Sequence, residues 1–310
     1  MKSALSADHF HSEEAAFEYV EARLWAFGRV CPHCGVVDSS GALKGKTTRV
    51  GLYKCYACRK PFTVRMGTIF ESSHVKLNIW LQAIYLLCSS KKGISTRQLQ
   101  RTFGGSLKTA WFLGHRIREA MRTGELAPMG GAGGIVEIDE TYIGRKQGFE
   151  VQRGGGHKNA VLTLVERGGA ARSFHVESVK KDDVMPIVRA NLDRETHVMT
   201  DEAGRYAKLG DEFARHDAVD HGRGEYGYTD RKTGAKINTN TVEGYYSIFK
   251  RGMIGVYQHC GEQHLHRYLA EFDFRYSNRI KLGIDDGARA ERALLGVKGK
   301  RLTYETTAQG

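Results

Sequence analysis

The chain has 310 residues, 41% of them apolar and 26% charged, a balance typical of a globular protein with two or three domains. Lys and Arg outnumber Asp and Glu by 12, which predicts a polyanionic partner and favours nucleic acid over an anionic membrane. No apolar run reaches the roughly 18 residues of a bilayer span, and the start lacks the pattern of a signal peptide, so a cytoplasmic protein is expected.

Residues 12–28 carry apolar side chains at helical intervals and predict an N-terminal helix. Two Cys-x-x-Cys pairs follow, separated by twenty residues and accompanied by short alternating runs that resemble strands. In a reducing compartment such pairs favour a metal over disulfides, and two pairs together close a tetrahedral site. The spacing therefore predicts one structural Zn²⁺, with four unrelated buried cysteines as the alternative; the ligands are Cys31, Cys34, Cys55 and Cys58.

Residues 77–121 predict three helices, broken at "KKGIS" and at "FGGS". The last two, joined by a tight glycine-containing turn, have the arrangement of a helix-turn-helix reader of DNA. A three-helix bundle with solvated basic faces would show the same pattern; the adjacent zinc site and the basic chain favour DNA binding. The predicted DNA contacts are Lys108, Arg116 and Arg118.

Glycines at 129–134 mark the start of the second half. The runs "IVEIDETYIG", "AVLTLVERGG" and "ARSFHVESV" predict three consecutive antiparallel strands. An amphipathic helix in "DDVMPIVRANLD", a short strand in "HVMTDEAG" and two long helices, "TVEGYYSIFKRGM" and "EQHLHRYLAEFDFRYSNRI", complete it. This order predicts an α/β domain with a mixed sheet.

Asp139 lies inside a run that otherwise suits a buried central strand, so its carboxylate needs a cation nearby. Glu137 alternates onto the same face and is the runner-up ligand, whereas Glu140 faces the other side. Asp201 ends another apolar run, at the C-terminal end of an expected neighbouring strand. Its alternative role is the N-cap of a following helix.

The stretch "INTNTVEGYYSIFKR", residues 237–251, has two interpretations. Asn240 and Glu243 match a capping box that only satisfies the free N–H groups of a helix start. Alternatively, Glu243 enters a metal site, with Lys250 two turns further along the same helix face. Three acids on a strand, a strand and a helix favour the second interpretation, because such a trio holds two divalent ions in phosphodiester chemistry.

From the cysteine pairs through "EIDETYIG", "TDEAGRY", "NTNTVEGYYSIFKRG" and "HLHRYLAEFDFRYSNR", the chain resembles the ISXO-type insertion-sequence transposases. The resemblance implies that Asp139, Asp201 and Glu243 are the catalytic acids and that Lys250 is the basic residue that follows them. Related groups have Asn as the third ligand, so Asn240 is the alternative to Glu243.

The resemblance also implies the fold: an α/β, RNase H-like DDE catalytic domain with a mixed sheet, preceded by a zinc ribbon and a helix-turn-helix-like segment. The expected parts are the N-terminal helix and zinc ribbon at 1–70, the DNA-binding segment at 71–128, the catalytic domain at 132–285 and a C-terminal tail at 286–310.

The expected activity is Mg²⁺-dependent cleavage and strand transfer at terminal inverted repeats, with two ions and with Mn²⁺ as an alternative. Double-stranded DNA, both element ends and target, is the expected partner, bound by a homo-oligomer in a bacterial, nucleoid-associated setting. The alternatives are a zinc-ribbon DNA-binding regulator with a non-catalytic scaffold, and an RNase H-like nuclease or resolvase that cuts without joining.

Overall fold

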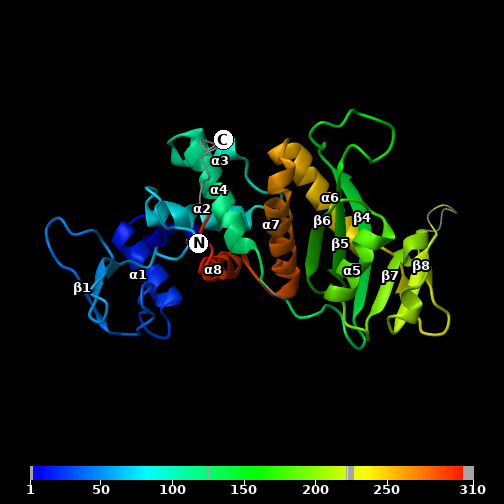
Figure 1. Cartoon of the computed structure of the whole chain (residues 1–310), viewed down its shortest axis with the longest axis horizontal. Helices are drawn as coiled ribbons and strands as arrows, with labels where there is room; N and C mark the ends of the chain where they lie inside the picture. The colour runs from blue at the N-terminus through cyan, green and yellow to red at the C-terminus, as the bar shows by residue number, and fades with distance from the viewer. Residues whose placement is uncertain (1–2, 125, 221, 223–226, 303–310) are drawn as a thin grey trace. The chain divides into compact units, whose positions relative to one another are not determined.

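The computed structural model describes residues 3–124, 126–220, 222 and 227–302. For these residues the chain divides into two compact units, each described here by itself (Figure 1). Unit 1 comprises Met1–Ser90, Ile94–Arg122 and Asp285–Gly310, and unit 2 comprises Lys91–Gly93 and Thr123–Ile284. In the described part of the chain, no helix is long and apolar enough to cross a membrane.

Unit 1 joins a small antiparallel sheet to a group of helices. Its helices begin at side chains that accept backbone N–H groups: Ser12, Ser95 and Ser106 cap the helices that follow them. The three helices expected between residues 77 and 121 are confirmed. The elements are α1 (Glu13–Leu24), β1 (Ser40–Ala42), β2 (Tyr53–Cys55), β3 (Pro61–Phe62), α2 (Leu77–Ser89), α3 (Thr96–Phe103), α4 (Leu107–Met121) and α8 (Asp286–Leu295).

The last described part of the chain contributes a helix to unit 1. Helix α8 belongs to unit 1, where it packs on α2 and α4. The Arg289 guanidinium donates to the carbonyl of Cys88 at 2.8 Å, and Glu291 forms an ion pair with Arg23 at 2.9 Å. Ala293 and Leu294 are buried, because one face of this short helix is apolar and needs a core. Residues 303–310 of the expected tail lie outside the described residues.

Unit 2 is built on a five-stranded mixed sheet with the strand order β6-β5-β4-β7-β8. The three consecutive antiparallel strands expected from the sequence are confirmed, and β7 and β8 continue the sheet in parallel with β4. The strands are β4 (Ile135–Ile143), β5 (Asn159–Glu166), β6 (Ala171–Val176), β7 (His197–Asp201) and β8 (Arg215–Val219), with a separate hairpin of β9 (Tyr228–Thr229) and β10 (Lys236–Ile237).

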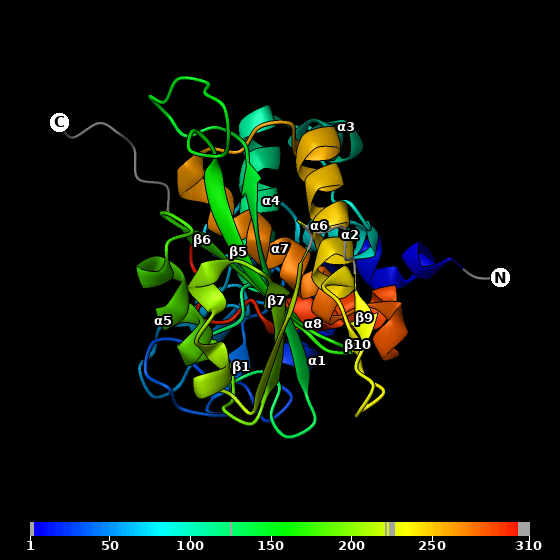
Figure 2. The same ribbon diagram turned by 90° about the vertical axis from the view of Figure 1, so that its right-hand side faces the viewer.

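Helices cover both faces of this sheet, as Figures 1 and 2 show. Helix α5 (Lys181–Asn191) packs on one face, where Val184 and Val188 meet Val136 and Ile138 of β4. Helices α6 (Asn240–Gly252) and α7 (Leu265–Ser277) pack on the other, chiefly through aromatic side chains. This mixed sheet between helical layers is the RNase H-like arrangement that the sequence predicts.

Candidate functional site

Four cysteine thiols converge in unit 1. Cys31 and Cys34 follow α1, whereas Cys55 is the last residue of β2 and Cys58 lies in the turn after it. The Sγ atoms of Cys31 and Cys58 are 3.7 Å apart, as are those of Cys34 and Cys55, and all four lie within 4.8 Å of one another. Four sulfur donors at this spacing fit a closed tetrahedral metal site.

Both cysteine pairs lie on the same kind of tight turn. The residue directly after each pair, Gly35 and Arg59, has a positive φ, 74° and 61° respectively. Backbone N–H groups of these turns point at the sulfur atoms, that of Val36 at Cys34 and that of Cys58 at Cys55. The N–H of Cys58 is the main cause of a lowered pKa at Cys55, about 7, whereas at Cys34 burial and the neighbouring thiols outweigh the N–H of Val36 and raise the pKa to about 11. Without a metal, negative charge therefore gathers at one thiol of the cluster, and a cation would favour ionisation of the others.

In unit 2, two of the predicted acids lie on neighbouring strands. Asp139 is in β4, and Asp201 is the last residue of β7. The two strands run parallel with Glu137 opposite Met199, so Asp139 and Asp201 follow two residues later at the same level of the sheet. Asp201 is not the N-cap of the helix Gly204–Tyr206, because Ala203 holds that position and the helix receives no side-chain cap. Asp201 Oδ1 does accept the N–H of Ala203 at 3.2 Å, two residues after it.

The third acid, Glu243, lies in the first turn of α6. Thr239, and not Asn240, precedes the helix, and it provides no side-chain cap. Asn240 is instead the first helical residue and is exposed. The capping box of Asn240 and Glu243 is therefore wrong. The Glu243 carboxylate accepts a hydrogen bond from the Thr239 hydroxyl at 3.3 Å.

The N–H groups at the start of α6 are capped by Glu137, the runner-up ligand. Its carboxylate is completely buried and accepts the backbone N–H groups of Thr241 and Val242 at 2.7 and 2.9 Å. Arg167 donates to the same carboxylate through Nε at 2.6 Å. Because these donors occupy its oxygens, Glu137 acts as a helix cap and not as a metal ligand in this structure.

The electrostatics of Asp139 mark the centre of the acidic site. Burial, together with the charges of Glu140, Asp201 and Glu243, raises the pKa of Asp139 from 3.8 to about 7. The N–H of Glu140, which donates to Asp139 Oδ1 at 2.8 Å, opposes this rise. Three elements thus bring negative charge close enough to Asp139 to disfavour its ionised form, which a cation would reverse.

Glu140 points to the opposite face of the sheet, as the alternation of β4 predicts. Its oxygens accept from Arg205 Nε and Nη2 at 3.0 and 2.6 Å and from the Tyr206 hydroxyl. The Arg205 guanidinium therefore balances the charge of Glu140, whereas Asp139 forms no ion pair with the residues that the structure describes.

Lys250 lies on the same face of α6 as Glu243, two turns further along. Its Nζ is 5.8 Å from the ring centre of Tyr246, a cation–π distance. The Tyr246 hydroxyl donates to the backbone carbonyl of Asp139 at 2.6 Å. Lys250 and Glu243 are both exposed, and Tyr246, which lies between them on α6, links this part of the helix to the acid-bearing strand.

The two candidate metal sites differ in how closely their donors are gathered. Within the described residues, the four thiols are the one group of three or more potential ligands whose donor atoms converge. The three carboxylates are not drawn together to that extent, as expected for like charges that repel one another.

Comparisons with known proteins agree with both sites. Residues 131–277 match the ISXO2-like transposase domain, and residues 11–61 match the transposase zinc-ribbon domain. The chain belongs to the ISXO2-like transposases. An uncharacterized protein in transposable element ISH50 of Halobacterium salinarum is 27% identical to it over 285 residues, which cover 86% of this chain and 91% of the relative. That organism is an archaeon, so this similarity does not assign a bacterial source.

In this ISXO2-like transposase, α4 presents its basic residues unequally. Lys108 lies in the exposed first turn of the helix. The Arg116 guanidinium donates to the carbonyls of Ile69 and Glu71 at 3.0 and 2.8 Å, and the side chain of Arg118 is 2% exposed. Burial makes Arg118 unavailable to DNA in this conformation, so only Lys108 of the three remains placed for contact.

One residue near the acidic site of this transposase has no signal in the local sequence. Arg167 directly follows β5 and forms the ion pair with Glu137. A basic residue at a strand end carries no local signal of such a partner, since Glu137 lies 30 positions earlier in the chain. The unusual acid inside the run "IVEID" was the available clue, because a buried glutamate needs a donor.

Proposed function

We propose that this protein is the DNA transposase of an insertion sequence. In this proposal it binds the terminal inverted repeats of its element and catalyses metal-dependent strand cleavage and strand transfer. The observation that carries the proposal is the placement of Asp139 and Asp201 at the same level of neighbouring parallel strands, within an ISXO2-like transposase domain. The raised pKa of Asp139, caused by burial and by acids that include Asp201 and Glu243, agrees with it. Clustered buried acids lower the stability of the fold, and a scaffold without catalytic function gains nothing in return.

Asp139, Asp201 and Glu243 are the proposed ligands of two Mg²⁺ ions. Their hard oxygen donors suit Mg²⁺ or Mn²⁺, and the like charges around Asp139 fit a site that requires cations. When bound, the ions supply activation of water or of a 3′-hydroxyl and neutralise charge on the departing oxygen. Asn240, exposed at the first position of α6, is the weaker candidate for the third ligand.

The chain's own residues contribute positioning and charge. Lys250, on the same helix face as Glu243, supplies a cation for a DNA phosphate near the acids. Tyr246 joins α6 to the carbonyl of Asp139, so a phosphate bound at Lys250 is kept in register with the strand that carries the first acid.

Unit 1 is the proposed reader of the element ends. The converged thiols are proposed to hold one structural Zn²⁺, which fixes the small sheet, and α4 presents Lys108 to the DNA. Arg116 and Arg118 support this surface from within, because they bind carbonyls or are buried. The active form on DNA is proposed to be a homo-oligomer, since both ends of an element must meet.

The experiment that tests the function incubates purified, zinc-loaded protein with Mg²⁺ and DNA that carries the repeats flanking its gene. Joined products in wild type, and their absence in Asp139→Asn with end binding retained, are the expected results. Cleavage without joining would favour the nuclease alternative, and end binding that needs no divalent cation and yields no cleavage would favour the regulator.

A further inference from the structure

Helix α6 is fastened to β4 on both sides of Glu243. Before it, the amides of Thr241 and Val242 donate to the Glu137 carboxylate at 2.7 and 2.9 Å, and the Thr241 hydroxyl donates at 2.7 Å. One turn after it, the Tyr246 hydroxyl donates to the carbonyl of Asp139 at 2.6 Å. The third acid is therefore bracketed by two attachments to the strand that carries the first.

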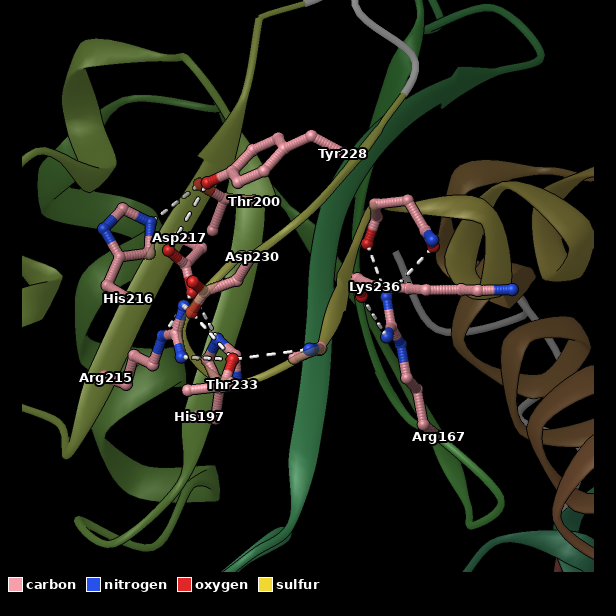
Figure 3. A network of polar contacts seen from close by, with 12 residues as sticks. Arg167, His197, Thr200, Arg215, His216, Asp217, Tyr228, Asp230, Thr233 and Lys236 are labelled. Carbon is pink, nitrogen blue, oxygen red and sulfur yellow. Dashed lines mark hydrogen bonds and ion pairs between the residues drawn. The ribbon is translucent and has the colours of Figure 1, made fainter.

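Arg167 extends this attachment to the segment that leads into the helix. Its Nη1 donates to the Lys236 carbonyl at 2.7 Å, and its Nη2 donates to the carbonyl and to Oδ1 of Asn238 at 2.8 and 3.0 Å (Figure 3). Its own backbone N–H donates to Ile135, the first residue of β4, at 2.9 Å. One guanidinium thus links the start of β4, the buried Glu137 and the approach to α6.

The other side of the same segment is tied to the far strands of the sheet. Asp230, in the turn of the β9–β10 hairpin, accepts from Arg215 of β8 at 2.6 Å. Arg215 also donates to Asp217 at 2.6 Å, and His197 of β7 contacts that carboxylate at 2.7 Å (Figure 3). The hairpin that precedes α6 is therefore held between the central strand and the edge strand.

The chemistry of Glu137 suits a fixed support. Its four donors, two helix amides, one hydroxyl and one guanidinium, match the acceptor capacity of a carboxylate. Two of them are the free amides at the positive end of the helix dipole, where a negative charge is stabilising. Burial strengthens each of these hydrogen bonds and fixes the helix start more firmly than an exposed cap does.

We propose that Glu137 and Arg167 are positioning residues, which hold the first turn of α6 so that Glu243 faces Asp139 and Asp201 in the geometry that binds catalytic cations. This inference rests on the proposed function, because it assumes that Glu243 is the third ligand. Neither residue is a proposed ligand of the cations, because the oxygens of Glu137 accept from Arg167 and from α6. Their effect reaches the site through the backbone of residues 236–243.

The test measures binding of Mn²⁺ alone to zinc-loaded, full-length protein, by the electron paramagnetic resonance signal of the free ion, with Asp139→Asn as the baseline. For Glu137→Gln we expect the half-saturating Mn²⁺ concentration to rise on the order of tenfold or more, as is common when residues behind metal ligands are changed. Hydrogen exchange of residues 239–243 should accelerate, with binding of DNA ends unchanged.

A matched control is Glu271→Gln, since Glu271 is also completely buried in unit 2 and paired with an arginine, Arg275. It should lower thermal stability without changing Mn²⁺ binding. If Glu137→Gln does not fold, Arg167→Lys takes its place: it keeps the charge and loses the bonds to Lys236 and Asn238.

Wild-type Mn²⁺ binding in the Glu137 and Arg167 variants, or equal weakening in Glu271→Gln, would overturn the inference. A wild-type protein that binds Mn²⁺ at Asp139 but joins no DNA would instead overturn the proposed function. In that case, weaker Mn²⁺ binding and faster exchange in Glu137→Gln would still support the positioning role.

Discussion

Asp139→Asn should stabilise the metal-free protein at pH 8, although it removes a proposed catalytic group. The pKa of Asp139 rises on folding from 3.8 to about 7, chiefly because the carboxyl is buried and then because Glu140, Asp201 and Glu243 surround it. A group whose pKa rises on folding contributes most to stability below its unfolded pKa. That contribution is lost between about pH 4 and 7, as the folded chain is forced to ionise.

The size of the effect follows from the shift. At about 1.4 kcal/mol per pKa unit, a change from 3.8 to about 7 corresponds to at most about 4.5 kcal/mol. Partial solvent exposure of the side chain reduces the expected gain for Asp139→Asn to about 1–3 kcal/mol at pH 8. The amide oxygen of Asn can still accept the Glu140 N–H, so little is lost in exchange.

The assay is urea unfolding of both proteins at pH 5 and pH 8, zinc-loaded and in buffer stripped of other divalent ions. All three tryptophans, Trp25, Trp80 and Trp111, lie in unit 1, so their fluorescence follows that unit and should not differ between the proteins. Hydrogen exchange of β4 follows unit 2. Saturating Mg²⁺ should narrow or reverse the difference in unfolding free energy between Asp139→Asn and wild type, because only wild type has all three proposed ligands.

A variant less stable than wild type at pH 8 without Mg²⁺ would refute the reasoning. An equal difference in unfolding free energy between the two proteins at pH 5 and pH 8 would refute it too. The stability gained by Asp139→Asn should be smaller at pH 5, where Asp139 of the folded wild type is mostly protonated.

Three further outcomes are expected. Purified protein should carry about one Zn²⁺ per chain. Cys55→Ser should lose the ion and loosen unit 1, while hydrogen exchange of the unit 2 sheet stays as slow as in wild type. Elemental analysis and limited proteolysis measure the first two effects, and a zinc-free wild type or an unchanged variant would contradict the prediction. Glu243→Ala should reduce the rate of strand cleavage on the order of a thousandfold. Asn240→Ala should cost at most about 1 kcal/mol of stability and leave the cleavage rate near that of wild type. Fast cleavage by Glu243→Ala together with slow cleavage by Asn240→Ala would make Asn240 the ligand. Lys108→Ala should weaken binding to terminal repeats and reduce the salt dependence of the binding constant by about one in log–log slope. Arg118→Ala should chiefly destabilise unit 1. Binding titrations at several salt concentrations measure the first effect, and melting curves measure the second.

The sequence by itself determined the features whose signal is local. The cysteine spacing predicted a thiol cluster that the structure confirms, and the serines and glycines around residues 95–106 predicted the helix breaks. Alternating runs predicted β4, β5 and β6, and the acids inside apolar strands marked Asp139 and Asp201 as unusual. These patterns can be read directly, because each depends on residues within a few positions of one another.

Only the tertiary structure decided which polar groups serve catalysis and which serve the fold. Glu137 and Asp139 share one face of β4, yet Glu137 caps a helix that begins more than a hundred residues later. Arg116 and Arg118 share a helix with Lys108, yet the surroundings of α4 turn the first toward carbonyls and bury the second. Composition and periodicity hold no information on such partners, because the free energy of a buried charge depends on donors brought together only when the whole chain has folded.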